Sequence, residues 1–370
     1  MSLINTGFPC PAPEGMEGTQ IPSLIARCAQ LAMLLEVSAS PKPGNVDREH
    51  NYPDTCFEHF VASSVSVYPV LELAARSRHG IGSLIRSAVC ESSAWQRGGN
   101  THFGAFLLLI PLSMAAGELF DSPERSNFKL SQDEFEDLAA RAHAFVKAAG
   151  CEDAVEFYRA FEVAGVRVNS VDEFSLANPD SAAELREQQV TLYKLMEIAE
   201  GYDLIANEWT SGFGRCLEGA RIVIEFMQVL SSETKNRVLN CSSTGINEAV
   251  VYTFLKLLSR HRDTFIQTKF DKETADYVSF RAGEILLAWE NSSGDTAEDS
   301  YYLKEDSSGP GGDHSSLTGK SFNLTRDISS LLSAAQEFDY ELLKKRINPG
   351  STADIIIAGI FIALLGGLRF

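Results

Sequence analysis

The stretch IPSLIARCAQLAMLLE, residues 21–36, places apolar side chains at steps of three and four positions. That spacing gathers them on one face of an amphipathic helix. Sustained alternation of apolar and polar residues, which would indicate strands, is not found. The sequence therefore predicts an all-α fold. The same helical periodicity recurs over residues 60–75, 81–95, 103–116, 131–149, 181–202, 220–230, 247–258, 273–289 and 328–343.

Prolines and one long apolar run qualify this prediction. Pro69 and Pro111 lie inside two of the periodic segments and are expected to kink or interrupt them. Residues 355–368 are almost wholly apolar, but the run is shorter than the roughly 18–20 residues of a membrane-spanning helix. Charged Asp354 and Arg369 bound it on either side. We therefore expect a buried core helix and no membrane association.

The chain of 370 residues is long enough for one large domain or two smaller ones. Residues 1–18 lack the basic and apolar regions of a signal peptide and are predicted to be a flexible tail. Residues 291–320 are rich in serine, glycine and aspartate, which predicts a mobile polar insertion at the surface. Because an apolar helix follows, we expect residues 19–370 to form a single multi-helix globular domain with this long insertion.

The composition argues against several classes of function. The 50 acidic and 32 basic side chains give a net charge of -18, which argues against binding nucleic acid or an anionic membrane. The seven cysteines lie far apart without a C-x-x-C pair, so neither a zinc site nor a disulfide scaffold is indicated. Reduced, buried thiols in a cytoplasmic protein are expected. Sequences typical of P-loop, Rossmann, serine-hydrolase or zinc-protease sites do not occur.

The first polar segment, SPKPGNVDR, occupies residues 40–48 after the opening helix. Two prolines around Lys42 prevent a helix, and Gly44 permits a close backbone approach. Lys42 and Arg48 could contact phosphate oxygens, and Asp47 a metal ion or hydroxyl group. A connector with solvated charges is the competing interpretation, and the residues alone favour it slightly.

The second polar segment, RGGNTHFG, occupies residues 97–104 and leads into an apolar helix. Glycines before a helix N-terminus let backbone N–H groups approach an anion. Asn100 or Thr101 would equally well cap the helix. His102 could act as a general acid or base, or bind a metal. A helix cap with a hydrogen-bonded histidine explains the segment about as well as a functional site does.

Three further acidic positions are weaker candidates. Asp203 and Glu208 are expected to be exposed acids, and Asp263 means little by itself. The segment NPGSTAD, residues 348–354, opens the last helix, where a serine or threonine would cap it. Asp354 in its first turn suits the helix dipole and could also reach a metal ion.

Together these segments resemble the triphosphoribosyl-dephospho-CoA synthase family, and more closely an archaeal-type branch of it. Two positions depart from the family pattern, since Phe103 replaces a frequent lysine and Phe265 an asparagine. The resemblance covers residue 24 to the C-terminus apart from the insertion. The matching residues are Pro41, Lys42, Pro43, Gly44, Val46, Asp47, Arg48, Glu91, Gly98 or Gly99, Asn100, Thr101, His102, Gly104, Pro349, Gly350, Thr352, Ala353 and Asp354.

The resemblance implies transfer of the 5-triphosphoribosyl group of ATP to the 2′-hydroxyl of 3′-dephospho-CoA, with release of adenine. It implies Mg²⁺ as the cofactor, no nucleic-acid or membrane partner, and leaves a homo-oligomer open. Two alternatives remain: the same transfer to another coenzyme-type acceptor such as a pterin-pathway intermediate, or a catalytically inactive nucleotide-binding protein. The implied residues are His102, Asp47 and Asn100 for catalysis, Lys42, Gly44, Arg48, Gly99, Thr101, Gly350 and Thr352 for nucleotide binding, and Asp47, Glu91 and Asp354 for the metal.

Overall fold

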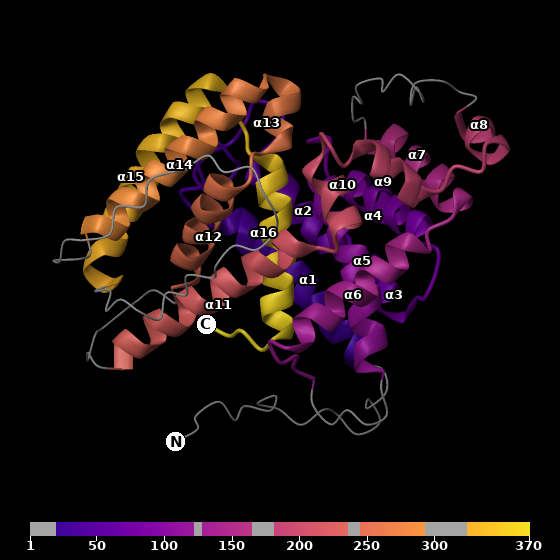
Figure 1. Cartoon of the computed structure of the whole chain (residues 1–370), viewed down its shortest axis with the longest axis horizontal. Coiled ribbons are helices and arrows are strands. Elements are labelled where there is room, and N and C mark those ends of the chain that lie inside the picture. The colour runs from indigo at the N-terminus through magenta and orange to yellow at the C-terminus, as the bar shows by residue number, and fades with distance from the viewer. Residues whose placement is uncertain (1–19, 122–127, 165–180, 236–244, 293–323) are drawn as a thin grey trace, which may run out of the picture.

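The computed structural model describes residues 20–121, 128–164, 181–235, 245–292 and 324–370. Over these ranges the chain is helical and contains no strand, which confirms the predicted fold class (Figure 1). The predicted tail, residues 1–18, and most of the predicted insertion, residues 291–320, lie outside the described residues.

The helices are short to medium in length. In chain order they are α1 (Gln20–Ser38), α2 (Phe57–Ser66), α3 (Tyr68–Arg76), α4 (Ile81–Trp95), α5 (Phe103–Phe120), α6 (Glu134–Lys147), α7 (Cys151–Ala164), α8 (Ser181–Glu187), α9 (Leu192–Ala199), α10 (Leu204–Ser211), α11 (Gly214–Lys235), α12 (Ile246–Arg260), α13 (Thr264–Lys269), α14 (Lys272–Ser292), α15 (Leu324–Lys345) and α16 (Gly350–Leu365).

The two most apolar helices, α5 and α16, form the centre of the core. Helix α16 runs through the middle of the molecule, with α12, α14 and α15 on one side and α4 to α7 on the other (Figure 1). It packs against α1, α5, α11 and α12. Nearly every side chain of both central helices is buried. The predicted buried C-terminal helix is therefore confirmed. Helices α1 and α5 are long and apolar enough to cross a membrane, but burial accounts for the apolar character of α5.

A pair of glycines lies at the crossing of α16 and α11. Helix α16 carries Gly359 and α11 carries Gly219, and their backbones lie against each other. A Cβ atom on Gly359 would stand 3.0 Å from the backbone of α11. Small residues at a crossing let two helices approach closely, and this one fixes α16, with its first turn, against α11.

Pro69 and Pro111 affect their helices differently. Pro69 falls in the first turn of α3, and the predicted helix over residues 60–75 breaks at Val67 into α2 and α3. Pro111 lies inside α5, which continues past it. Because proline has no N–H, Leu107 loses its helical donor four residues on. The indole Nε1 of Trp209 supplies a hydrogen bond to that carbonyl instead, at 2.9 Å, and joins α10 to α5.

Three expectations need correction. The predicted helix over residues 181–202 is divided into α8 and α9, because the Thr191 hydroxyl caps α9 by accepting from the Lys194 N–H. Of the described cysteines, all free thiols, Cys90 is exposed rather than buried. Glu208 is fully buried, not exposed, because its carboxylate pairs with Arg215 and accepts N–H groups at the start of α11.

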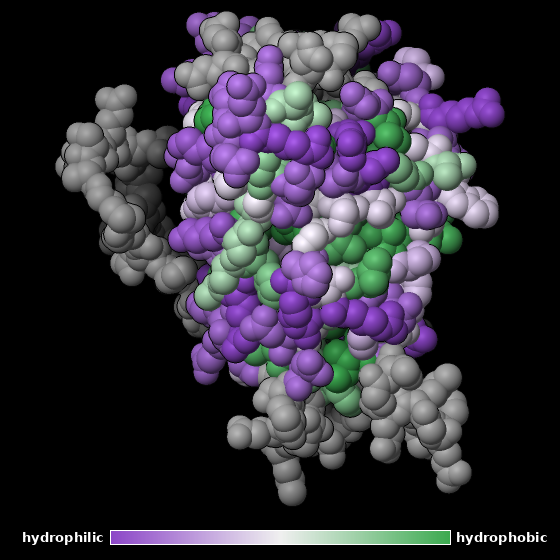
Figure 2. All heavy atoms as spheres, turned by 90° about the vertical axis from the view of Figure 1, so that its right-hand side faces the viewer, coloured by the Kyte–Doolittle hydropathy of each residue, from purple (hydrophilic) through white to green (hydrophobic). Residues whose placement is uncertain are grey.

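The molecular surface agrees with the acidic, polar composition. Figure 2 shows the face on the right of Figure 1, which is covered mainly by hydrophilic side chains. Smaller areas of apolar side chains reach the surface between them. Such areas are common on soluble proteins and identify no partner by themselves.

Candidate functional site

The loop that follows α1 is a fixed structure rather than a solvated connector. The side chain of Asn247, from α12, accepts from the Ser40 N–H and donates to the Ser40 carbonyl, both at 2.9 Å. Gly44 donates its N–H to Asp339 of α15 at 2.8 Å. The Tyr52 hydroxyl donates to the Gly44 carbonyl at 2.7 Å. Helices distant in sequence therefore hold this loop in one conformation.

Asp47 organises the same loop from within. It is buried, and one carboxylate oxygen accepts the N–H groups of Glu49 and His50 at 2.8 and 2.9 Å. The other oxygen accepts the Lys42 N–H at 3.3 Å. Gly44 has φ +74, and a side chain there would clash with the Ile347 carbonyl. These two residues shape the loop, and their catalytic, nucleotide and metal roles remain predictions.

Lys42 points inward and not toward solvent. Its ammonium group forms an ion pair with the carboxylate of Glu36, at the end of α1, and both side chains are buried. Burial raises the pKa of Glu36, while the charge of Lys42 partly offsets that rise. Arg48, in contrast, is exposed and donates to Asn247 at 3.1 Å. Of the two predicted phosphate ligands, only Lys42 lies in the interior.

The turn before α5 is closed by its own side chains. The Asn100 side chain accepts the Phe103 N–H at 3.0 Å and so caps the helix, although Asn100 is itself exposed. Gly99 has φ +69 and an exposed backbone, and its carbonyl accepts from the Gln96 side chain at 2.9 Å. Thr101 is half-buried, with its hydroxyl 3.4 Å from that of Ser92.

His102 is the buried member of this turn. Its Nδ1 lies 2.9 Å from the Ser63 hydroxyl of α2, which accepts in turn from Ser92 of α4 at 2.8 Å. The Phe60 ring packs edge-on against the imidazole, with centroids 4.9 Å apart. Nε2 has no hydrogen-bond partner among the described residues. Burial, assisted by the charge of Lys42, lowers the pKa of His102 to about 3, so the ring is neutral at pH 7.

Asp354 joins the last helix to this turn. Its carboxylate lies directly against Gly104 and accepts the backbone N–H of Ala105, at the start of α5. Any side chain on Gly104 would clash with it. Burial, and next the negative charge of Glu36, raises the pKa of Asp354 well above its usual value. The three separate polar segments of the sequence therefore meet around Lys42, His102 and Asp354.

The buried carboxylate of Asp263 fixes the first turn of α16 beside these three residues. Asp263 caps α13 and accepts both the N–H and the hydroxyl of Thr352, at 2.7 and 2.8 Å. Burial raises its pKa to about 6. Gly350 lies close to the ring of Phe265, since a Cβ there would stand 3.1 Å from it. Thr352 thus holds α16 in place, and its role toward a nucleotide remains a prediction.

The predicted metal ligands are not gathered into one cluster. Glu91 lies on the exposed face of α4, and both oxygens of Asp47 accept backbone N–H groups. Within the described part of the chain, no three histidine, cysteine, aspartate or glutamate side chains are placed to hold a metal. Mg²⁺ commonly takes only one or two carboxylates, with phosphate oxygens and waters completing its shell. Of the predicted ligands, Asp354 fits that smaller requirement, since it is half-buried at the point where the three segments meet, whereas the nearby Glu36 is already paired with Lys42.

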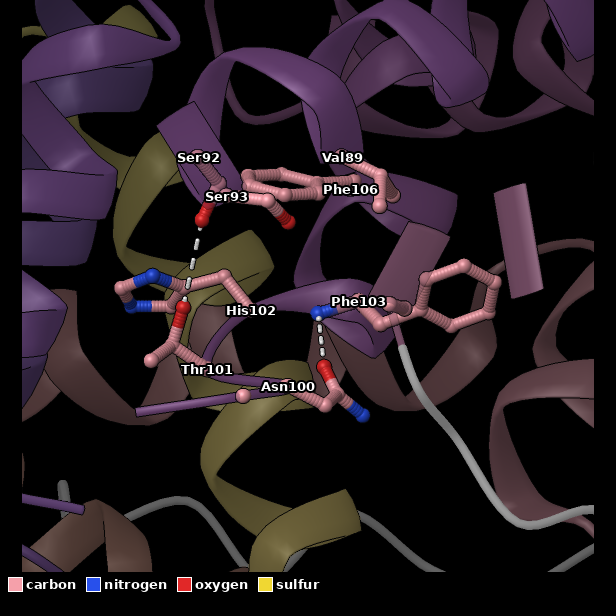
Figure 3. A pocket seen from close by; sticks show the side chains of 10 residues that line it. Val89, Ser92, Ser93, Asn100, Thr101, His102, Phe103 and Phe106 are labelled. Carbon is pink, nitrogen blue, oxygen red and sulfur yellow. Dashed lines mark hydrogen bonds between the residues drawn. The ribbon is translucent and has the colours of Figure 1, made fainter. Parts of the chain in front are cut away.

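A small pocket opens beside His102 (Figure 3). It lies between α4, the turn before α5, the first turns of α5 and the end of α7. Asn100 and Thr101 contribute polar atoms to its wall, and Phe103 and Phe106 contribute rings. The His102 and Phe103 side chains extend in opposite directions in Figure 3, so they belong to different walls.

Several residues of the site were not identified from the sequence. Glu36 ends a helix as an ordinary acid would, and only the folded loop shows that Lys42 reaches it. Ser63 lies in an amphipathic helix where a serine carries no particular signal. Asp339 and Asn247 act on the loop from about two hundred or more residues away in the chain. Asp263 has no assigned role in the sequence prediction, although its position at a helix start suggests a cap.

Comparisons with known proteins agree with this geometry. The family model described as ATP:dephospho-CoA triphosphoribosyl transferase matches residues 22–312 and 323–369. A crystal structure from Archaeoglobus fulgidus, described as that of a candidate triphosphoribosyl-dephospho-CoA synthase, is similar with a TM-score of 0.55 and 25% sequence identity. The similarity covers 85% of this chain and 100% of that one. No curated protein sequence matches the chain. The chain therefore belongs to the ATP:dephospho-CoA triphosphoribosyl transferase family.

Proposed function

We propose that the protein transfers the 5-triphosphoribosyl group of ATP to the 2′-hydroxyl of 3′-dephospho-CoA. The supporting observation is the convergence of Lys42, His102 and Asp354, from three distant segments, at the start of α5. A buried cation, a neutral imidazole and a carboxyl group are the functional groups that such a transfer needs.

In the proposed reaction the 2′-hydroxyl oxygen bonds to C1″ of the ATP ribose. The C1″–N9 bond to adenine breaks, and its electron pair goes to the adenine ring. The hydroxyl proton leaves the acceptor and is taken up by the released adenine. Glycosyl transfer of this kind passes through an oxocarbenium-like transition state, so it gains from groups that hold the ribose and move one proton.

Lys42 is the proposed anchor for the triphosphate, because its charge is buried and attraction between charges is strong where water is excluded. His102 is the proposed group that moves the proton. In the tautomer whose Nδ1–H donates to the Ser63 hydroxyl, Nε2 can accept one, but the charge of Lys42 opposes this. A bound triphosphate would offset that charge and so remove the smaller of the two causes that lower the pKa of His102.

Asp354, with Glu36 beside it, would hold the Mg²⁺ that accompanies ATP. The ion, when bound, supplies positive charge that offsets the charge of the triphosphate. Independently of the ion, Asp354 keeps the first turn of α5 at a fixed distance from α16 through its contacts with Gly104 and Ala105. That contact positions His102, which immediately precedes the same helix.

Product analysis tests this proposal. Purified protein is incubated with ATP, Mg²⁺ and 3′-dephospho-CoA, and the mixture is separated by chromatography with mass detection. We expect free adenine and an equal amount of 3′-dephospho-CoA carrying one triphosphoribosyl group. Adenine formation that depends on a different acceptor would replace 3′-dephospho-CoA in the proposal. No adenine with any acceptor, from folded protein, would overturn it.

A further inference from the structure

The imidazole of His102 is oriented by side chains that are themselves buried. We propose that Ser63, supported by Ser92, is a positioning residue: its hydroxyl holds Nδ1 of His102 and leaves Nε2 as the ring nitrogen that can meet a substrate. The importance of that nitrogen for adenine release rests on the proposed function. The orientation itself follows from the contacts of the ring, the burial of both serines and the packing of α2.

One nitrogen of the ring has a partner and the other has none. Nδ1 lies 2.9 Å from the Ser63 hydroxyl, whereas Nε2 has no hydrogen-bond partner among the described residues. A hydroxyl can both donate and accept, so Ser63 can pair with Nδ1 whether or not that nitrogen carries the proton. Turning the ring over by 180° would place a carbon atom against the hydroxyl and lose the bond. The contact with Ser63 therefore favours one of the two orientations of the ring.

Ser92 keeps the Ser63 hydroxyl in place. The Ser92 hydroxyl donates to that of Ser63 at 2.8 Å, and the two side chains come from different helices, α4 and α2. The Ser92 hydroxyl also lies 3.4 Å from that of Thr101 (Figure 3). Because Ser63 is bonded to both Ser92 and His102, its side chain has little freedom to turn away from the ring.

Water cannot take over the role of Ser63. Ser63, His102 and Ser92 are 0%, 1% and 4% exposed, respectively. Truncation of Ser63 to alanine would remove a single oxygen atom, which leaves less space than a water molecule needs. Nδ1 would then stay unpaired, and leaving a buried polar group unpaired is costly. Without the hydroxyl, the ring would lose its preference for one orientation.

A single face of α2 makes both contacts with the imidazole. Phe60 and Ser63 are three residues apart, so they lie on the same side of the helix. The Phe60 ring packs against the imidazole at an interplanar angle of 87°. Ser64, the next residue, is fully buried too, but its hydroxyl donates to the Phe60 carbonyl of its own helix at 2.7 Å. Ser64 therefore provides a matched control for Ser63.

Adenine release by serine variants of the full-length protein tests this role, with ATP, Mg²⁺ and the acceptor supplied. Ser63→Ala should slow release at least about fivefold, because Nδ1 loses its partner. Ser92→Ala should have a smaller effect in the same direction, and Ser64→Ala should release adenine at the unsubstituted rate. In a His102→Gln background, Ser63→Ala should cause no further loss, because residues that act as a unit have non-additive effects. Unchanged affinity for inorganic tripolyphosphate shows that each serine variant is folded.

Nitrogen NMR of protein labelled at histidine gives a readout that needs no turnover. The signals of His102 are those that disappear in His102→Gln. Ser63→Ala should shift the Nδ1 signal, because that nitrogen loses its hydrogen bond. Ser64→Ala should leave the signal where it is.

A measurable rate of adenine release that Ser63→Ala leaves unchanged, or that Ser64→Ala lowers equally, would overturn the inference. A full additional loss on adding Ser63→Ala to His102→Gln would also overturn it, since Ser63 would then act on another group. An unmoved Nδ1 signal in Ser63→Ala would contradict the contact itself. If the unsubstituted protein releases no adenine but the Nδ1 signal moves, the proposed function fails and the positioning of the imidazole by Ser63 stands.

Discussion

The ammonium group of Lys42 and the carboxylate of Glu36 form a buried ion pair between the end of α1 and the loop that follows it. The pair directs Lys42 of the first polar segment into the interior, whereas Arg48 is exposed and Asp47 bonds within its own loop. Removing the Lys42 charge should therefore change both the stability of the protein and its affinity for phosphate groups, and the two effects can be measured separately.

Substituting Lys42 by methionine should lower the free energy of unfolding by about 3 kcal/mol, because it leaves Glu36 buried without a partner. The double variant Glu36→Gln, Lys42→Met should recover most of that loss, since neither charge remains. Urea denaturation measures both. Tripolyphosphate affinity should fall in the single and the double variant alike. Equal stability of the single variant and the unsubstituted protein would show that the pair is not desolvated.

The contact of Gly104 with Asp354 predicts a steric effect. Gly104→Ala should cost about 1–3 kcal/mol of stability, because its methyl group would clash with the carboxylate and force α5 and α16 apart. Adding Asp354→Ala should relieve the clash. The matched control is Gly214→Ala at the start of α11, where a Cβ would meet no atom within 4 Å. That change should leave stability unaltered or raise it slightly. Thermal unfolding of the unsubstituted protein, Gly104→Ala, Gly104→Ala with Asp354→Ala, and Gly214→Ala measures these differences in stability.

The hydrogen bond from Trp209 to Leu107 depends on Pro111, which can be tested by a double-mutant cycle. Trp209→Phe should cost about 1–3 kcal/mol, because it leaves a buried carbonyl without a donor. In a Pro111→Ala background the helix regains its own N–H, so the same substitution should cost less. Identical costs in both backgrounds, measured by urea denaturation, would mean that the proline does not create the need for the indole.

Burial of neutral His102 predicts a pH dependence of stability. Its pKa is about 3 in the folded protein against an ordinary value of 6.5, so between these values the unfolded chain binds a proton and the folded chain does not. Stability from this residue is complete above pH 6.5 and is lost as the pH falls. Relative to His102→Gln, the protein should lose about 2–3 kcal/mol between about pH 6.5 and pH 4.5.

The control for that titration is His79→Gln, a change at an exposed histidine. Its free energy of unfolding should follow that of the unsubstituted protein across the same range. Parallel curves for His102→Gln and the unsubstituted protein would contradict the buried, neutral imidazole.

Much of the helical framework could be predicted because apolar periodicity is a local property. Helix α4 has the predicted bounds, and α5 and α16 begin within the polar segments that were expected to open them. The interruption expected from Pro69 is found at Val67. The division of residues 181–202 was missed, since it depends on the local cap that Thr191 gives α9.

The site was only partly predictable. The segments around Lys42, His102 and Asp354 could be chosen from residue types, and they do converge. The partners of these residues could not be predicted, because hydrogen bonds such as that of Asp263 with Thr352 join residues far apart in the chain. Glu91 illustrates the opposite case. Helical phase turns Ser92 inward and Glu91 outward, so the acid lies on the surface.

The rate of adenine release in matched histidine variants tests the central claim most directly. With ATP, Mg²⁺ and the acceptor supplied, His79→Gln should release adenine at the rate of the unsubstituted protein. His102→Gln should be slower by about 10²–10⁴-fold, the usual contribution of a positioned acid or base, while binding tripolyphosphate with undiminished affinity. An unchanged rate of adenine release in folded His102→Gln would contradict the assignment of His102 as the group that moves the proton.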